Sequence, residues 1–90
     1  MTNTYIKCFW YHSYPDCPTL IYSELDEERW EIRKVEVFSD GSKGFAPGME
    51  LGKSELGKVA IPPNEEISRD PQFQCLEISQ KEFEEAWNGR

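Results

Sequence analysis

The sequence has few of the residues that usually carry chemistry. Its 90 residues include one histidine and three cysteines. The cysteines, Cys8, Cys17 and Cys75, are odd in number and show no C-x-x-C spacing, so we expect neither a zinc site nor a disulfide framework of the secreted kind. The sequence therefore predicts reduced thiols, no bound metal and no cofactor.

Long apolar runs and an excess of basic residues are also absent. No uninterrupted apolar stretch could span a bilayer, and the beginning "MTNTYIK" lacks the apolar core of a secretory signal. Seventeen acidic residues stand against ten basic ones, which gives a net charge of −7. Nucleic acids and anionic membranes both need a basic footprint, so we expect neither as a direct partner. These absences predict a cytoplasmic protein.

The apolar residues that are present suffice for one core. Hydrophobic residues make up 38% of the chain and aromatic residues 13%, which predicts a single domain over residues 1–90. Large aromatic side chains bury the most area per residue, so Trp10, Trp30 and Trp87 are expected to fill much of this core.

Segments rich in β-branched and aromatic residues predict most of the secondary structure as strands. The predicted strands are Thr4–Tyr11, Thr19–Leu25, Arg29–Phe38, Phe45–Ala46 and Phe73–Ile78, with one more irregular strand around Leu56–Ile61. The acidic link "DEE" and the Asp-Gly of "SDGSKG" predict tight antiparallel turns.

The third predicted strand changes the phase of its apolar residues. Trp30 and Ile32 have one parity, whereas Val35 and Val37 have the other. A change of phase within a strand indicates a β-bulge or a strong bend, which we expect at Arg33–Lys34.

Two segments predict short helices. The first begins at Pro63 or Asn64 and ends before Asp70–Pro71. The second is the C-terminal "SQKEFEEAWN", with Ser79 as its N-cap and Gly89 at its end. The fold class predicted is α+β: a mostly antiparallel, twisted sheet of four to six strands with one or two short helices packed on one side.

Candidate catalytic groups are few. His12 lies near Asp16 and Cys17 in a proline-bearing loop, and a thiol with a histidine and a carboxylate can form a nucleophile. Nothing nearby predicts an oxyanion hole, so we expect this loop to be structural and the protein not to be an enzyme. Arg29 and Arg33 have the same parity, which favours cross-strand ion pairs over a clamp for a substrate carboxylate.

Three parts of the chain together carry a family resemblance: "PDCPTLIYSELDEERWEIRKVEVFSDG", "SELG" and the closing "EISQKEFEEAW". They resemble a family of small, single-domain bacterial proteins of unknown function. Some members of that family look like antitoxin-like immunity proteins of contact-delivered toxins. The resemblance implies a stand-alone cytoplasmic protein, and it brings no catalytic residues with it.

The leading functional hypothesis is an immunity-type protein that neutralises a basic, contact-delivered toxin domain of the nuclease class by direct binding. An acidic surface speeds association with a basic partner through electrostatic steering. The predicted contact residues lie on the second hairpin and are Glu24, Asp26, Glu27, Glu28 and Glu31. A competing acidic patch on the last helix consists of Glu82, Glu84 and Glu85. The alternatives are another non-enzymatic interaction domain, including one that forms homo-oligomers through a strand edge, and, third, an enzyme acting on a small molecule.

Overall fold

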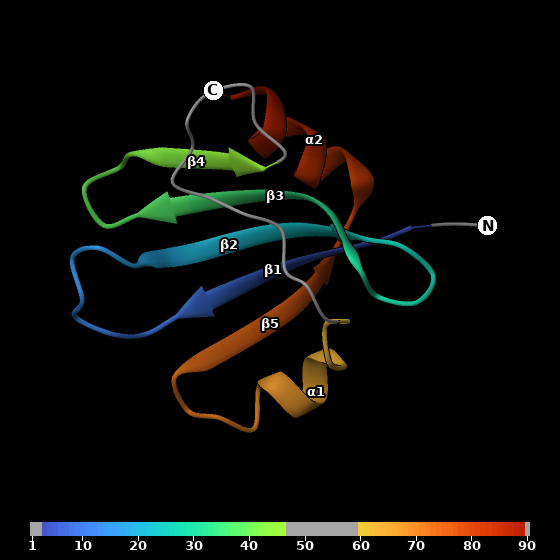
Figure 1. The fold of residues 1–90 in the computed structure, drawn as a ribbon, viewed down its shortest axis with the longest axis horizontal. Coiled ribbons are helices and arrows are strands. Elements are labelled where there is room, and N and C mark those ends of the chain that lie inside the picture. The colour runs from blue at the N-terminus through green and yellow to red at the C-terminus, as the bar shows by residue number, and fades with distance from the viewer. Residues whose placement is uncertain (1–2, 47–59, 90) are drawn as a thin grey trace.

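One antiparallel sheet organises the protein. The computed structural model describes residues 3–46 and 60–89. The elements in chain order are β1 (Thr4–Trp10), β2 (Pro18–Leu25), β3 (Glu31–Phe38), β4 (Lys43–Ala46), α1 (Asn64–Ile67), β5 (Phe73–Ile78) and α2 (Gln80–Asn88). The strands lie in the order β4-β3-β2-β1-β5, and each pairs antiparallel with its neighbours (Figure 1). The predicted α+β class is confirmed.

The connections explain this strand order. Short links join β1 to β2, β2 to β3 and β3 to β4, so these four strands form a meander. The last turn contains Gly41 with φ of +89°, a conformation that glycine adopts without steric cost. β5 then returns along the free side of β1, so β4 and β5 are the two edges of the sheet.

The two helices contact opposite faces of the sheet. Phe83 of α2 is fully buried and packs with Tyr5 and Val35 on one face. Ile67 of α1 packs on the opposite face, against a cluster that includes Ile6. Because side chains alternate along a strand, Tyr5 and Ile6 must point to opposite faces. The helix at each face therefore covers a separate small core, and the prediction that the helices pack on one side of the sheet is wrong.

The C-terminal helix has the ends that its sequence predicts. The side chain of Ser79 accepts a hydrogen bond from the main-chain N–H of Glu82, and Gly89 is the C-cap. Phe83 and Trp87 lie on the face that docks against the sheet. Among residues 3–46 and 60–89, no helix has the length and apolar character needed to cross a bilayer.

The prediction of reduced thiols is wrong for two of the three cysteines. Cys8 on β1 and Cys75 on β5 lie directly opposite each other in the strand register and form a disulfide. Cys17 is free and half-buried. The two bonded cysteines are 67 residues apart, so only the register between β1 and β5 brings them together.

The third strand is shorter than predicted, and its irregularity lies elsewhere. β3 begins at Glu31, because Arg29 has φ of +67° and belongs to the preceding turn. Glu24 pairs with Arg33 while Leu25 pairs with Glu31, so Ile32 is the extra residue of a β-bulge. The predicted change of phase is thus real but lies just before Arg33. The irregular strand predicted around residues 56–61 lies almost wholly outside the described residues.

Candidate functional site

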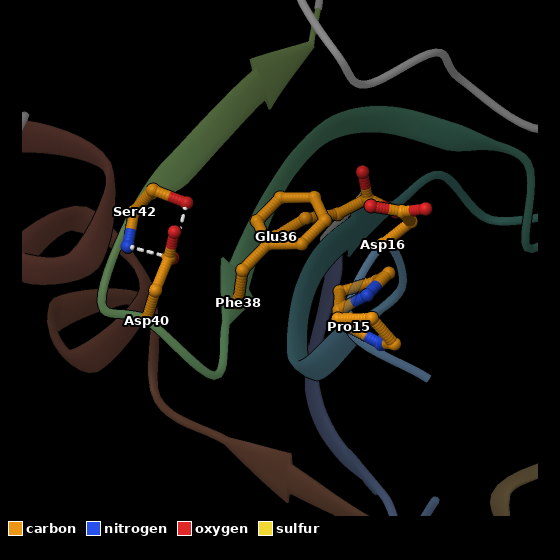
Figure 2. A pocket seen from close by; sticks show the side chains of 7 residues that line it. Pro15, Asp16, Glu36, Phe38, Asp40 and Ser42 are labelled. Atoms are coloured by element: carbon orange, nitrogen blue, oxygen red, sulfur yellow. Dashed lines mark hydrogen bonds between the residues drawn. The ribbon is translucent and has the colours of Figure 1, made fainter. Parts of the chain in front are cut away.

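The β2–β3 hairpin carries acidic groups at both of its ends. At one end, the β1–β2 loop and the β3–β4 turn enclose an open pocket of about 430 Å³ (Figure 2). Asp16, Glu36 and Asp40 line it together with Phe38. The main-chain N–H and the hydroxyl of Ser42 both donate to the Asp40 carboxylate, at 2.9 and 2.6 Å. Within the described ranges, no group of three or more potential metal ligands converges.

The loop beside this pocket is organised by His12. Its Nε2 lies 2.7 Å from the carbonyl oxygen of Pro18, and its Nδ1 accepts the main-chain N–H of Tyr14 at 2.9 Å. These two contacts fit the neutral ring with the proton on Nε2, which donates to Pro18. Both nitrogens are therefore used in holding the loop, and His12 is not free to serve as a base for Cys17.

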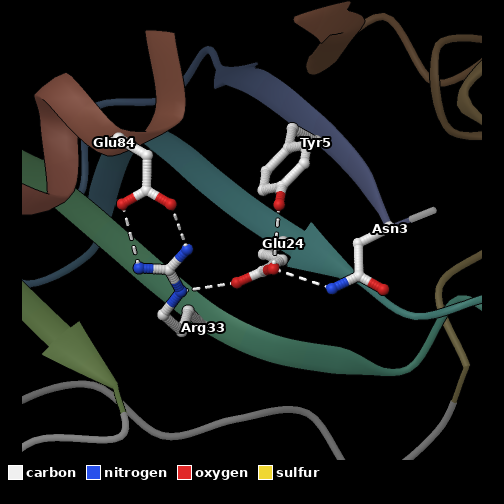
Figure 3. A network of polar contacts seen from close by, with 5 residues as sticks. All are labelled: Asn3, Tyr5, Glu24, Arg33 and Glu84. Atoms are coloured by element: carbon white, nitrogen blue, oxygen red, sulfur yellow. Dashed lines mark hydrogen bonds and ion pairs between the residues drawn. The ribbon is translucent and has the colours of Figure 1, made fainter. Parts of the chain in front are cut away.

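A polar network lies close to the β2–β3 turn, and Glu24 is its centre (Figure 3). Arg33 Nε donates to one Glu24 oxygen at 2.5 Å. The other oxygen accepts from Tyr5 Oη at 3.0 Å and from Asn3 Nδ2 at 2.8 Å. The remaining guanidinium nitrogens of Arg33 bind both oxygens of Glu84 on α2, at 3.2 and 2.6 Å. Residues from β1, β2, β3 and α2 thus meet in one network.

The electrostatics of this network keep Glu24 ionised. Burial favours the neutral acid, but hydrogen bonds from Arg33, Asn3 and Tyr5 outweigh it and hold the pKa of Glu24 below its usual value. Hydrogen bonds to Glu84 and to Glu24 raise the pKa of Arg33, against the effect of burial. The same pairing with Arg33 lowers the pKa of Glu84.

Two of the five predicted contact residues do not face solvent. The side chain of Glu24 is 8% exposed and that of Glu31 is 6% exposed. Glu31 accepts a hydrogen bond from the hydroxyl of Ser23 at 3.2 Å and lies 3.5 Å from Lys34 Nζ. The prediction that both glutamates point outward is wrong. The bulge and the alternation of side chains along the strands direct both of them into polar clusters within the sheet.

The other three predicted residues form the β2–β3 turn. Asp26 is half-buried, whereas Glu27 and Glu28 are exposed. The Asp26 carboxylate accepts the main-chain N–H groups of Glu28 and Trp30, at 2.9 Å each. The N–H of Asp26 in turn donates to the carbonyl oxygen of Trp30 at 3.0 Å. Asp26 therefore shapes the turn, and Glu27 and Glu28 are its outward charges.

The arginine within this turn points away from the acidic residues. Arg29 Nε donates to the carbonyl oxygen of Ile61 at 2.9 Å, and its Nη2 donates to Pro62 and Asn64. The carbonyl oxygen of Arg29 also accepts the N–H of Ile61 at 2.7 Å. These bonds hold Arg29 at its positive φ, which is uncommon for a residue with a side chain. The guanidinium of Arg29 therefore binds the segment that leads into α1.

As a result, the turn keeps its negative charge. In the part of the chain that the structure describes, neither Glu27 nor Glu28 forms a salt bridge. The competing patch on α2 differs, because Glu82 is 2.8 Å from Lys7 Nζ and Glu84 is bound to Arg33. Only Glu85 of that patch is fully exposed.

Two apolar side chains beside the turn were not predicted to be on the surface. Trp30 is 41% exposed and Ile32 is 37% exposed. Trp30 was expected in the core, but it lies between the left-handed Arg29 and the start of β3. The break in apolar phase around Arg33 was the one sequence signal that could have indicated this exposure.

Comparisons with known proteins give a family and no function. Neither the curated proteins nor the solved structures contain a match to this chain. One family model, described as a domain of unknown function, matches residues 4–90. That range includes the β2–β3 turn, both helices and every residue of the polar network except Asn3. The chain therefore belongs to the family of the domain of unknown function DUF6881.

Proposed function

We propose that this protein is a non-catalytic binding protein that neutralises a basic partner by direct contact through the β2–β3 turn. One observation carries the proposal: within residues 3–46 and 60–89 the exposed carboxylates of Glu27 and Glu28 form no salt bridge, and Trp30 lies exposed beside them. Aromatic side chains are frequent anchors of protein interfaces, and charges around such an anchor add steering and specificity.

The proposed partner is a toxin domain, and the proposed role is that of an immunity protein. The resemblance of "YSELDEERWEIRKVEVF" to a bacterial family, some members of which look antitoxin-like, supports this role, as does the net charge of −7. A nuclease toxin would present a basic substrate groove, and an acidic inhibitor would meet that groove with complementary charge. The proposal needs no catalytic group in this chain.

The location proposed is the cytoplasm, where a delivered toxin would act. The Cys8–Cys75 disulfide is the feature that argues against this location, because disulfides persist mainly in oxidising compartments. A count of reactive thiols in protein from the native compartment would decide between the two.

The runner-up function, self-association through a strand edge, has weaker support. On the β5 edge, the N–H of Cys75 donates to the Ser68 hydroxyl at 3.0 Å. The N–H of Phe73 donates to the main-chain carbonyl oxygen of Asp70 at 2.9 Å. The β4 edge has four residues and begins with Lys43. Short, charged or already bonded edges are the ways in which proteins prevent edge pairing.

Co-purification from the native organism, followed by mass spectrometry, tests the proposal. We expect a basic protein whose association rate falls as ionic strength rises, because salt screens exposed charges beyond ~8–10 Å. An acidic or neutral partner, or a rate independent of salt, would contradict the proposal. So would enzymatic turnover that is lost in His12→Ala or Cys17→Ala.

A further inference from the structure

Trp30 combines exposure with a fixed position. Its main-chain N–H and carbonyl oxygen are both bonded to Asp26, so the residue closes the base of the turn. Its side chain nevertheless remains 41% exposed, and Ile32 adds a second exposed apolar side chain two residues further on. Large apolar side chains gathered at one point of a surface mark contact sites more often than scattered ones do.

Among the described residues, cations lie over aromatic rings other than that of Trp30. Arg33 Cζ lies 4.9 Å from the ring centre of Phe83 and 5.1 Å from that of Trp87. Lys7 Nζ lies 5.6 Å from the ring centre of Phe9. Over residues 3–46 and 60–89, no comparable cation lies over Trp30.

The nearest arginine in the sequence is also unavailable. Arg29 lies between Glu28 and Trp30, but its guanidinium is bound to Ile61, Pro62 and Asn64. Glu28 and Trp30 are two residues apart, so their Cα atoms are at most ~7 Å apart. The turn therefore offers an aromatic ring and carboxylates close together, while its own cation, Arg29, is bound elsewhere.

We propose that Trp30, together with Glu27 and Glu28, receives an arginine side chain of the basic partner. This inference rests on the proposed function, because it takes the partner to be a basic protein. A guanidinium is flat and weakly hydrated, so it can stack on an indole ring while donating paired hydrogen bonds to a carboxylate. A lysine ammonium carries the same charge but lacks this shape and holds its water more strongly.

Two peptides of equal charge test the inference on the full chain. The probes are acetyl-Gly-Arg-Arg-Arg-Gly-amide and the same peptide with three lysines, titrated against the ¹⁵N-labelled protein at low salt. We expect the arginine peptide to bind about two- to fivefold more tightly, the usual advantage of an exposed cation–π contact. The indole N–H resonance of Trp30 should shift in that titration.

Matched variants assign any preference to this site. Trp30→Leu should remove the preference for arginine while leaving weak binding of both peptides, and Trp30→Phe should keep part of it. Glu27→Gln with Glu28→Gln should weaken both peptides, whereas Glu65→Gln with Glu66→Gln, an exposed pair on α1, should not. The ¹⁵N spectrum of each variant shows whether it remains folded.

The results that overturn the inference are distinct from those that overturn the proposed function. Equal affinity for the two peptides, no detectable binding, or a preference that survives Trp30→Leu would overturn the inference. If binding of the co-purified partner nevertheless depends on Glu27 and Glu28, the inference about arginine is wrong and the proposed function stands. If binding of that partner depends on neither the two carboxylates nor Trp30, the inference and the proposed function are both overturned.

Discussion

Substitution of Arg33 by methionine tests whether the polar network holds the hairpin and the last helix together. Methionine keeps an unbranched apolar chain next to Phe83 and Trp87, but it removes the hydrogen bonds that Arg33 donates to Glu24 and Glu84. Glu24 would then stay buried with only Tyr5 and Asn3 as donors.

The expected cost follows from the burial of each pair. The side chains of Arg33 and Glu24 are 22% and 8% exposed, so removing one partner leaves a buried charge uncompensated. Such losses cost about 3–5 kcal/mol. The side chain of Glu84 is 34% exposed, so its ion pair with Arg33 adds at most about 1 kcal/mol. We therefore expect the free energy of unfolding at pH 7 to fall by about 3–5 kcal/mol.

The difference in stability between the native protein and Arg33→Met should depend on pH in a defined direction. In the native protein the pKa of Glu24 is lowered, so its contribution to stability is present above the unfolded pKa and is lost as pH falls through the folded pKa. In Arg33→Met, burial should instead raise the pKa of Glu24, so the variant loses stability as pH rises through the unfolded pKa. The difference between the two proteins should therefore be large at pH 7 and should shrink below about pH 4.

Urea unfolding followed by circular dichroism at pH 7 and pH 3.5 measures this difference. The double variant Glu24→Gln with Arg33→Met is the control, because it removes the buried charge and should recover much of the lost stability. A loss below about 1 kcal/mol at pH 7 would place the pair among weak surface salt bridges and refute the reasoning. An equal loss at both pH values would show that packing, rather than charge, explains the effect.

Two further predictions concern the core. Trp87→Ala should lower the free energy of unfolding by about 3–5 kcal/mol, because the ring packs on Phe83 and Phe45, and an unchanged urea midpoint would show that α2 is peripheral. Protein purified without reductant and then denatured should contain one reactive thiol, that of Cys17, and reduction should cost about 4 kcal/mol for a loop of this length. Three reactive thiols in protein from the native compartment would show that the disulfide does not form there.

The sequence predicted those parts of the fold that depend on local signals. Ser79 and Gly89 indicated both ends of α2, and the Asp-Gly turn led correctly into β4. The predicted bulge was displaced only slightly, since an apolar phase change indicates that a bulge exists and not which residue it adds.

What the sequence could not predict depends on register and on backbone conformation. Pairing of Cys8 with Cys75 required the alignment of β5 with β1. Trp30 was predicted in the core because large aromatic side chains are usually buried. The left-handed conformation of Arg29, which precedes Trp30 in the turn, has no signal in the sequence. Glu24 was taken as an outward charge because an acidic residue in a strand is usually solvated. Its partners Asn3, Tyr5 and Arg33 lie on other strands or before β1 and meet it only in the folded sheet.

The structure also changes how the binding surface must be tested. Asp26 holds the turn through its carboxylate, so its reversal would disturb the backbone as well as the charge. Glu84 is bound to Arg33, so reversals on α2 would disturb the polar network. Glu27 and Glu28 have neither role. The exposed Glu65 and Glu66 on α1 provide a control with the same change in charge.

The association rate with the co-purified partner tests the central claim most directly. Glu27→Lys with Glu28→Lys and Glu65→Lys with Glu66→Lys each bring the net charge from −7 to −3, since each reversal adds two charges. The account predicts that the turn variant associates at least about tenfold more slowly at low salt, whereas the α1 variant changes far less, because steering depends on charge near the contact. Equal rates for the two variants would contradict the claim that this protein binds its partner through the β2–β3 turn.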